Sequence, residues 1–379
     1  MILRNVPFAQ FGMDIKEKNK KMILFGAGTL LTGWIPYVLE RYEITDKVLG
    51  IMDNSASKWG NQVCINGMLF LVEPVEKMIS TVTEDTMILI TSSYFAAMIE
   101  QLDNIRELEY TECYAAPIMH ITNKTREEAD IRSFMEKRQN IPKIIHYCWF
   151  GKKAMPERNR KYVESWKKFC SGYEIIEWNE TNYDVHKNQY MGQAYDAGKY
   201  GYVPDYARID ILHEYGGIYL DTDVELIRNI DELLYLQAFT SFEEYPTVNF
   251  GGGSGSIKGH PMLKSILEYR ENAQFVYPDG SYNTTTCGYF ETVPLQRAGL
   301  KLDGAIQNIN GLTVLSSEYF HPKSSVTGMT DVTENTYAIH QFSWSWVDEE
   351  QMKEKKRTHE EYENILRRMQ GSKSHRGQS

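Results

Sequence analysis

The sequence contains few cysteines and none of the thiolate patterns that usually bind a metal. Its five cysteines, Cys64, Cys113, Cys148, Cys170 and Cys287, are odd in number, widely spaced and never arranged as C-x-x-C. This spacing argues against a structural zinc site and against a disulfide framework. We therefore expect reduced, mostly buried thiols, as in a cytoplasmic protein.

The chain also lacks an excess of positive charge and any long apolar run. Lys and Arg total 41 and Asp and Glu total 51, so the formal net charge is −10, and nucleic-acid binding through bulk charge is not expected. No apolar run reaches the ~18 residues of a membrane span, and the first residues do not form a secretory signal. The 379 residues, 42% of them hydrophobic, predict a soluble protein of two globular domains.

The order of apolar strands and helical segments predicts an α/β protein. Strands beginning near residues 21, 47 and 86 alternate with helical segments, one of which continues to about Arg41. This alternation is typical of parallel βαβ units. We predict a Rossmann-like parallel-sheet domain over residues 1–125, a linker helix over 126–140, a second α/β domain over 141–350, and a C-terminal helix with a polar tail over 351–379.

A glycine-rich loop opens the first helix of the first domain. Gly26 and Gly28 follow an apolar strand, and Asp53 ends the next strand. In dinucleotide-binding units the glycines admit a pyrophosphate and the acid binds a ribose hydroxyl. Because Leu31 stands where a third small residue belongs, the loop is consistent both with a nucleotide site at Gly26, Gly28 and Asp53 and with a Rossmann-like fold that binds nothing.

Residues 203–223 carry the strongest signal. Pro204 and Asp205 suit the start of a helix, and Gly216-Gly217 suits its end. Asp205 and Arg208 fall on one helix face together with apolar residues, so their charges need buried partners. A short strand, Ile218-Tyr219-Leu220, then leads into Asp221-Thr222-Asp223.

Asp221 and Asp223 are predicted to bind a divalent metal ion. Residues i and i+2 of a strand point the same way, so both carboxylates would lie on one side of the strand end. Paired carboxylates are hard oxygen ligands that suit Mg²⁺ or Mn²⁺. A bare Asp-x-Asp is usually a solvated turn, but the preceding helix, double glycine and apolar strand favour a metal site.

The block D-Y-A-R-x-x-x-L-x-x-Y-G-G-I-Y-L-D-T-D, residues 205–223, resembles the signature of the Asp-x-Asp sugar transferases of glycosyltransferase family 32. Further pieces match in order: the opening strand IPKIIHYCWFG at 141–151, the N-F-G-G-G run from Asn249, and the closing A-I-H-Q-F-S-W-S-W at 338–346. The resemblance covers residues 141–346 and implies a GT-A type α/β fold for that domain.

The resemblance also implies roles for individual residues. In related glucosylating toxins a Trp like Trp149 stacks on the nucleotide base. Other residues expected to bind the donor are Asp205, Arg208, Tyr219, Asn249, Ser345 and Trp346. His340 is implied as a third metal ligand beside Asp221 and Asp223, although Gln341, which replaces a second His of the family, offers an amide oxygen instead.

The implied activity is a metal-dependent, retaining sugar transfer in which Asp205, Arg208, Asp221 and Asp223 serve catalysis. The donor would be a UDP- or GDP-sugar, and the acceptor a saccharide or lipid-linked saccharide in bacterial surface or capsular polysaccharide synthesis. We expect Mn²⁺ or Mg²⁺ as cofactor and a cytoplasmic location, with the enzyme at the inner face of the membrane as a further option. Residues 351–379 carry 8 basic against 4 acidic residues, which fits either an exposed helix or a peripheral membrane contact.

Two other functions are compatible with parts of the sequence. The N-terminal loop permits an NAD(H)-linked or nucleotide-sugar oxidoreductase, although no Tyr-x-x-x-Lys stands in the expected context. A non-catalytic sugar-nucleotide-binding protein would keep the fold alone, but the complete set of Asp205, Arg208, Asp221 and Asp223 argues for an enzyme.

Overall fold

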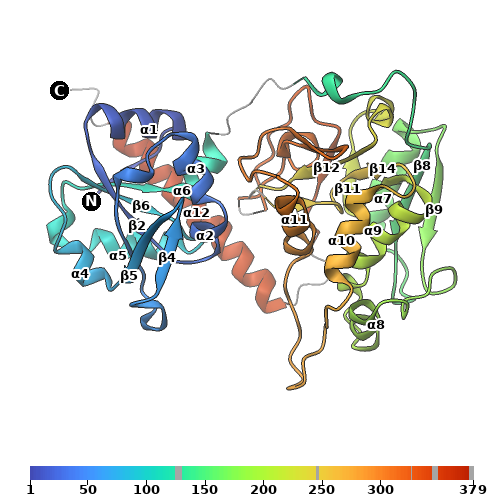
Figure 1. The fold of residues 1–379 in the computed structure, drawn as a ribbon, viewed down its shortest axis with the longest axis horizontal. Helices are drawn as coiled ribbons and strands as arrows, with labels where there is room; N and C mark the ends of the chain where they lie inside the picture. Colours follow the sequence, from blue (N-terminus) through green and yellow to red (C-terminus); the bar gives the residue numbers. More distant parts are fainter. Residues whose placement is uncertain (124–129, 245–246, 326, 344–348, 375–379) are drawn as a thin grey trace. The chain divides into compact units, whose positions relative to one another are not determined.

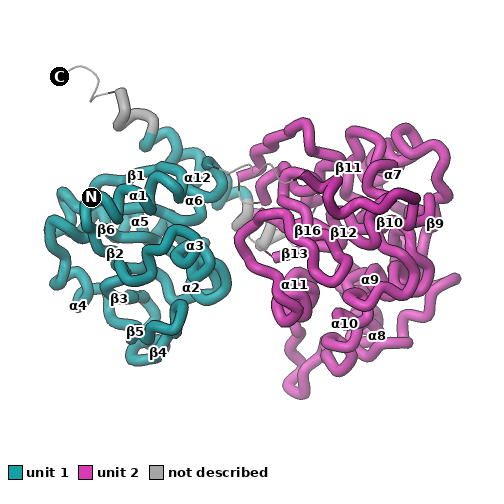
Figure 2. Tube along the Cα trace, turned by 45° about the horizontal axis from the view of Figure 1, so that its top comes forward, with its two compact units in different colours: residues 1–126, 354–379 teal, residues 127–353 magenta. Residues whose placement is uncertain are grey.

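The computed structural model describes residues 1–123, 130–244, 247–325, 327–343 and 349–374. The chain divides into two compact units, unit 1 with residues 1–126 and 354–379, and unit 2 with residues 127–353. Figure 2 colours these two units. Within the described ranges, no helix is both long and apolar enough to cross a membrane.

Unit 1 is built on a mostly parallel sheet in the order β1-β7-β6-β2-β3-β5-β4, in which only the β4–β5 pair is antiparallel (Figure 1). Its strands are β1 Ile2–Arg4, β2 Lys21–Phe25, β3 Val48–Met52, β4 Gln62–Ile65, β5 Met68–Glu73, β6 Thr86–Ile90 and β7 Glu112–Ala115. Its helices are α1 Phe8–Glu17, α2 Thr29–Gly33, α3 Ile35–Arg41, α4 Val75–Ile79, α5 Phe95–Asp103, α6 Ala116–Thr122 and, from residue 354 onward, α12 Glu349–Ser374.

The side chains of β2 show why this sheet is covered on both faces. Met22 and Leu24 enter one core with residues of α1 and α3, whereas Ile23 and Phe25 enter a second core with residues of α4 and α5. Successive residues of a strand point to opposite faces, and a strand buried on both sides reads as a continuous apolar run. The α/β class with parallel strands is thus as predicted.

The helix expected to continue to Arg41 is interrupted. It consists of α2 and α3, which meet at Trp34, and Pro36 lies in the first turn of α3. Proline has no N–H to continue the hydrogen-bond ladder of a preceding helix. The break therefore follows from Pro36, which the sequence analysis did not weigh.

Unit 2 contains a mixed sheet in the order β15-β16-β12-β14-β10-β8-β9, with β13 paired to β12, and a separate β11–β17 pair. Its strands are β8 Ile144–Cys148, β9 Glu174–Trp178, β10 Gly217–Tyr219, β11 Val224–Leu226, β12 Ala238–Phe242, β13 Val248–Asn249, β14 Ser254–Ser256, β15 Gln307–Ile309, β16 Leu312–Leu315 and β17 Ala338–His340. Its helices are α7 Glu157–Phe169, α8 Gln189–Asp196, α9 Pro204–Tyr215, α10 Pro261–Arg270 and α11 Cys287–Arg297.

Two segments differ in part from what the sequence suggested, the stretch before Ile141 and the C-terminal helix. The expected linker helix over 126–140 is, in its described part, only a 3-10 turn at Ile131–Phe134, because Ile131, Phe134 and Met135 pack on the core of unit 2 instead of repeating along a helix. The final helix is not simply exposed. Tyr362 and Ile365 of α12 are buried in a core of unit 1, with Leu366 and Met369 packed against it, so this apolar stripe is already covered within the protein.

Candidate active site

The Asp-x-Asp acids lie directly after β10, in a turn rather than in the strand. The backbone N–H of Val224 donates to the carbonyl of Asp221 at 3.0 Å, which closes the turn. The alternation of side chains along a strand was predicted to place the two acids on one side. In the structure the turn brings them together instead. One ligand atom from each of Asp221, Asp223 and His340 lies within 4.8 Å of the others, so the turn and β17 form one group of metal-binding type.

Asp223 is held by residues around β17. Its Oδ2 accepts hydrogen bonds from the backbone N–H of Ser343 at 2.8 Å and from the Ser343 hydroxyl at 3.0 Å, and its Oδ1 lies 3.3 Å from Nε2 of His340. Burial opposes ionisation, but His340 and these donors hold the pKa of Asp223 far below its usual value. Burial likewise opposes the charge of His340, yet Asp223 raises the pKa of this imidazole.

Asp221 is anchored between a tyrosine and a glycine loop. The buried Tyr219 hydroxyl donates to Oδ1 of Asp221 at 3.1 Å, and the backbone N–H of Asp221 donates to the carbonyl of Gly251 at 2.8 Å. A Cβ atom at position 251 would lie 2.2 Å from Oδ2 of Asp221 and 2.3 Å from Nη1 of Arg208. Glycine is thus required here by the close approach of the loop to both charged groups.

Asp205 and Arg208 form a buried ion pair within α9. Nη2 of Arg208 donates to Oδ1 of Asp205 at 2.9 Å and lies 3.7 Å from Oδ2 of Asp221. Arg270 of α10 approaches the other oxygen of Asp205 at 3.5 Å. Both oxygens of Asp205 therefore already face arginines, which suits a residue that orients Arg208 better than one that binds a sugar hydroxyl.

Glu291 of α11 completes this buried cluster and was missed by the sequence analysis. It is fully buried, its Oε1 lies 3.8 Å from Nη1 of Arg208, and its Oε2 accepts from the backbone N–H of Phe250 at 2.9 Å. Burial raises the pKa of Glu291 to about 7, although Arg208 opposes the shift. No motif surrounds Glu291, and Arg270 was missed for the same reason.

Of the remaining residues predicted to bind the donor, Trp149 and Asn249 lie in the described part of unit 2. Trp149 is partly exposed at the end of β8, and its indole N–H donates to the carbonyl of Lys153 at 2.6 Å. The Oδ1 of Asn249 accepts from the backbone N–H groups of Gly251 and Gly252 at 2.7 and 3.2 Å, so this side chain shapes the loop. Ser345 and Trp346 lie outside the described residues.

The structure separates the two residues considered for the third metal ligand. His340 lies in the group with Asp221 and Asp223. The Gln341 amide instead donates to Glu225 at 2.8 Å and accepts from the Lys323 ammonium at 2.9 Å. This places the functional groups of Gln341 in a different polar network and favours His340.

Asp53, the acid beside the N-terminal glycine loop, already accepts hydrogen bonds from other groups of unit 1. Oδ2 of Asp53 accepts from the backbone N–H of Ala27 at 2.7 Å and from the Lys58 ammonium at 2.9 Å, and Oδ1 accepts from the N–H of Ser55 at 2.8 Å. Gly26 has a φ of 114°, which suits glycine. These contacts give Gly26 and Asp53 a structural use without a nucleotide.

Comparison with known proteins places this site in a family. Residues 156–240 match the model of the glycosyltransferase sugar-binding region containing the DXD motif. The chain is 31% identical over 193 residues to an uncharacterized glycosyltransferase of Acanthamoeba polyphaga mimivirus, covering 48% of this chain and 73% of that protein. It is also 31% identical over 156 residues to inositol phosphoceramide mannosyltransferase 3 of Schizosaccharomyces pombe, covering 38% of this chain and 42% of that protein.

Solved structures give weaker matches. PaToxG glycosyltransferase aligns with a TM-score of 0.35 and 20% identity, covering 42% of this chain and 70% of that one. A glycosyltransferase involved in glycosylation of the major capsid of PBCV-1 aligns with a TM-score of 0.32 and 14% identity, covering 59% of this chain and all of that one.

Proposed function

Because the chain belongs to the glycosyltransferases with a DXD sugar-binding region, we propose that it transfers a sugar from a UDP- or GDP-sugar with the help of Mn²⁺ or Mg²⁺. The observation that carries this proposal is the convergence of Asp221, Asp223 and His340, whose ligand atoms lie within 4.8 Å of one another. Two carboxylates are the donor set that these ions favour. When bound there, such an ion would neutralise negative charge that develops on the departing diphosphate.

The residues of the chain prepare this position in three ways. Ser343 and His340 keep Asp223 ionised through hydrogen bonds and charge. Arg208 supports Asp221 from behind, and is itself oriented by Asp205 at 2.9 Å. Gly251 lets its loop approach these charges closely, since a Cβ atom there would lie 2.2 Å from Oδ2 of Asp221. Such preorganised charges lower a barrier because they need not reorient during the reaction.

Donor selection and stereochemistry form the second part of the proposal. We assign base stacking to the partly exposed Trp149 at the end of β8, and retention of anomeric configuration by the resemblance to family 32. The acceptor is a saccharide or a lipid-linked saccharide of the cell surface. A relative named as a mannosyltransferase acting on inositol phosphoceramide supports a lipid-linked acceptor. Five free cysteines support a reducing, cytoplasmic location, where such acceptors are available at the inner membrane face.

The test is hydrolysis or transfer with a panel of UDP- and GDP-sugars, with Mn²⁺, with Mg²⁺ and with a chelator. We expect one donor to be consumed only when the ion is present. Asp221→Asn and Asp223→Asn should each lower turnover by about 100-fold or more, since a group that stabilises the transition-state charge is lost. The matched control is Asp279→Asn, which changes an exposed carboxylate on a loop of the same unit.

Retention would be read from the anomeric proton of the first product by NMR. Unchanged turnover in a folded Asp221→Asn or Asp223→Asn variant, or turnover that survives chelation, contradicts the metal-dependent mechanism. Binding of NAD(H) by the unmodified protein, followed by nicotinamide absorbance or fluorescence, would instead favour the oxidoreductase that the N-terminal loop suggested.

A further inference from the structure

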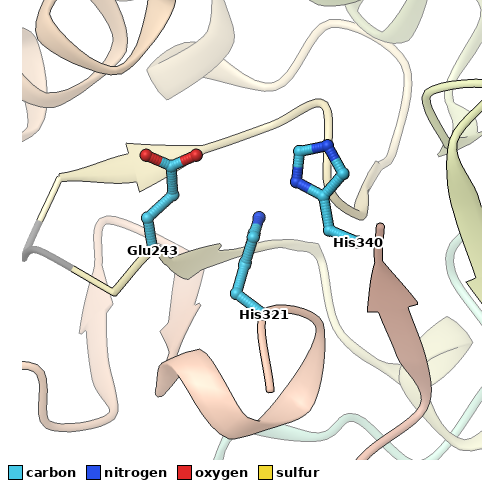
Figure 3. A group of neighbouring side chains, drawn as sticks. All are labelled: Glu243, His321 and His340. Atoms are coloured by element: carbon cyan, nitrogen blue, oxygen red, sulfur yellow. The ribbon is translucent and has the colours of Figure 1, made fainter. Parts of the chain in front are cut away.

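A second group of potential metal ligands lies beside the Asp-x-Asp turn. It consists of Glu243, directly after β12, His321, and His340 at the end of β17, and one ligand atom from each lies within 4.8 Å of the others. Figure 3 shows the carboxylate of Glu243 and ring nitrogens of both histidines turned toward a common space. Three segments far apart in the sequence therefore meet here through imidazole and carboxylate groups.

Each of the three side chains is held from behind by another polar group. The Ser241 hydroxyl lies 3.0 Å from Nδ1 of His321, and the Asn249 amide donates to Oε1 of Glu243. Nε2 of His340 lies 3.3 Å from Oδ1 of Asp223. Metal-binding histidines usually have their second ring nitrogen fixed in this way, because the outer bond sets the tautomer and the ring orientation.

One ring nitrogen of His340 faces the group without being used by Asp223 (Figure 3). Nδ1 of His340 is buried and, among the residues that the structure describes, has no hydrogen-bond partner. The imidazole of His321 lies against the glycine loop, because a Cβ atom at Gly252 would approach its Nε2 to 2.0 Å. A buried ring nitrogen without a partner is costly unless something occupies its lone pair or takes its proton.

We propose that Glu243, His321 and His340 bind a divalent transition-metal ion of the Zn²⁺ class, at a site separate from the ion of Asp221 and Asp223. Two imidazoles and one carboxylate suit Zn²⁺ and similar ions, whereas Mg²⁺ and Ca²⁺ prefer oxygen ligands alone. Burial of Glu243 disfavours its charge, and a cation at this position would offset that cost.

In the proposed site the two ring nitrogens of His340 have different functions. Nδ1 binds the second ion, and the Nε2–H donates to Asp223, as in a carboxylate–histidine–metal arrangement. On this assignment Asp221 and Asp223 would hold the first ion, and His340 would support that site through Asp223, in place of the role of third ligand considered above. The inference does not depend on the sugar donor or on transfer, because it concerns the metal content of the chain alone.

The experiment loads the chelator-treated full chain with one equivalent of Zn²⁺ and follows binding by equilibrium dialysis with mass-spectrometric metal analysis. We expect Zn²⁺ to stay bound in the unmodified chain and in Asp221→Asn, and His321→Gln to bind it at least tenfold more weakly. The matched control is His186→Gln, which makes the same change at an exposed histidine and should bind Zn²⁺ like the unmodified chain. Mg²⁺ in tenfold excess should not displace Zn²⁺.

X-ray absorption at the zinc edge tests the unmodified chain directly, so the outcome does not depend on the folding of a variant. Two imidazole ligands per zinc are expected. A spectrum with one or no imidazole overturns the proposal, as does equal affinity in a folded His321→Gln chain. Loss of Zn²⁺ in Asp221→Asn with retention in His321→Gln also overturns it, and assigns His340 to the Asp-x-Asp ion. Mn²⁺-dependent sugar-nucleotide hydrolysis, measured separately, shows whether the proposed function stands on its own.

Discussion

Two acidic turns in this molecule look alike in sequence and differ in what surrounds them. Asp53 follows β3 beside a glycine loop in unit 1, and Asp221 follows β10 beside a glycine loop in unit 2. Asp53 is satisfied by two backbone N–H groups and Lys58. Asp221 shares one buried arginine, Arg208, with two further carboxylates. The chain's own groups therefore match the charge of Asp53 more completely than that of Asp221.

The two turns also differ in the number of acidic and basic groups that surround them. Around Arg208 and Arg270 lie the carboxylates of Asp205, Asp221 and Glu291, so three acids face two cations. Around Asp53 one acid faces one ammonium. An unmatched buried negative charge is relieved by a proton or by a bound cation, which fits the raised pKa of Glu291 and the metal-binding type of the Asp221 group.

The largest expected effect comes from Arg208→Met. Removal of the guanidinium leaves the buried carboxylates of Asp205 and Glu291 and the partly exposed Asp221 near one remaining arginine, and breaking a buried pair costs about 3–5 kcal/mol. Urea unfolding of the full chain should show this loss in the transition of unit 2. The comparable change in unit 1, Lys58→Met, affects an ammonium that is 38% exposed and should cost less than about 1 kcal/mol. Equal losses in the two variants would contradict the contrast between the turns.

Glu291→Gln should alter the pH dependence of stability. Because burial raises the pKa of Glu291 to about 7, the folded chain keeps a proton that the unfolded chain releases above its ordinary pKa near 4.5. Unfolding free energy therefore falls as the pH rises from about 4.5 to about 7, by at most about 3 kcal/mol. We expect urea unfolding at pH 5 and pH 8 to show a smaller difference in Glu291→Gln. The same pH slope in both chains would exclude a proton on Glu291.

Asp53→Asn should have a smaller effect than Arg208→Met or Glu291→Gln and should leave sugar transfer unchanged. Burial opposes ionisation, but the Ser55 N–H, Lys58 and the Ala27 N–H lower the pKa of Asp53. The ionised form therefore stabilises the folded chain above about pH 4, and this stability is lost as the pH falls through the lowered pKa. Thermal unfolding at pH 7 should reveal a loss of about 1–2 kcal/mol. A large loss of transfer in this variant would instead make the N-terminal loop part of the reaction.

The sequence was sufficient for features that depend on neighbours along the chain. The helix from Pro204, the short strand before Asp221 and the pairing of Asp205 with Arg208 one turn later all follow from local spacing and capping. Family matching confirmed the enzyme class that the 205–223 block predicted. The domain limits and the roles of individual site residues stay predictions.

The features that were missed or wrong depend on distant packing. Glu291 and His321 approach the site from segments without a recognisable motif, and only the fold brings them near Arg208 and His340. The polar stretch before Ile141 has helical composition, but burial of Ile131 on unit 2 overrides that preference. Local propensity is weak where a few apolar residues can reach a core.

The burial of α12 in unit 1 has a consequence for synthesis. Tyr362 lies in a core with Phe95, so the first unit is interrupted by residues 127–353 and completed only by residues beyond 353. At translation rates of about 5–20 residues per second, an incomplete core waits about 10–50 seconds for its last helix. During that interval the apolar surface around Phe95 is open to chaperones and proteases, and unit 2 can fold before the unit that precedes it.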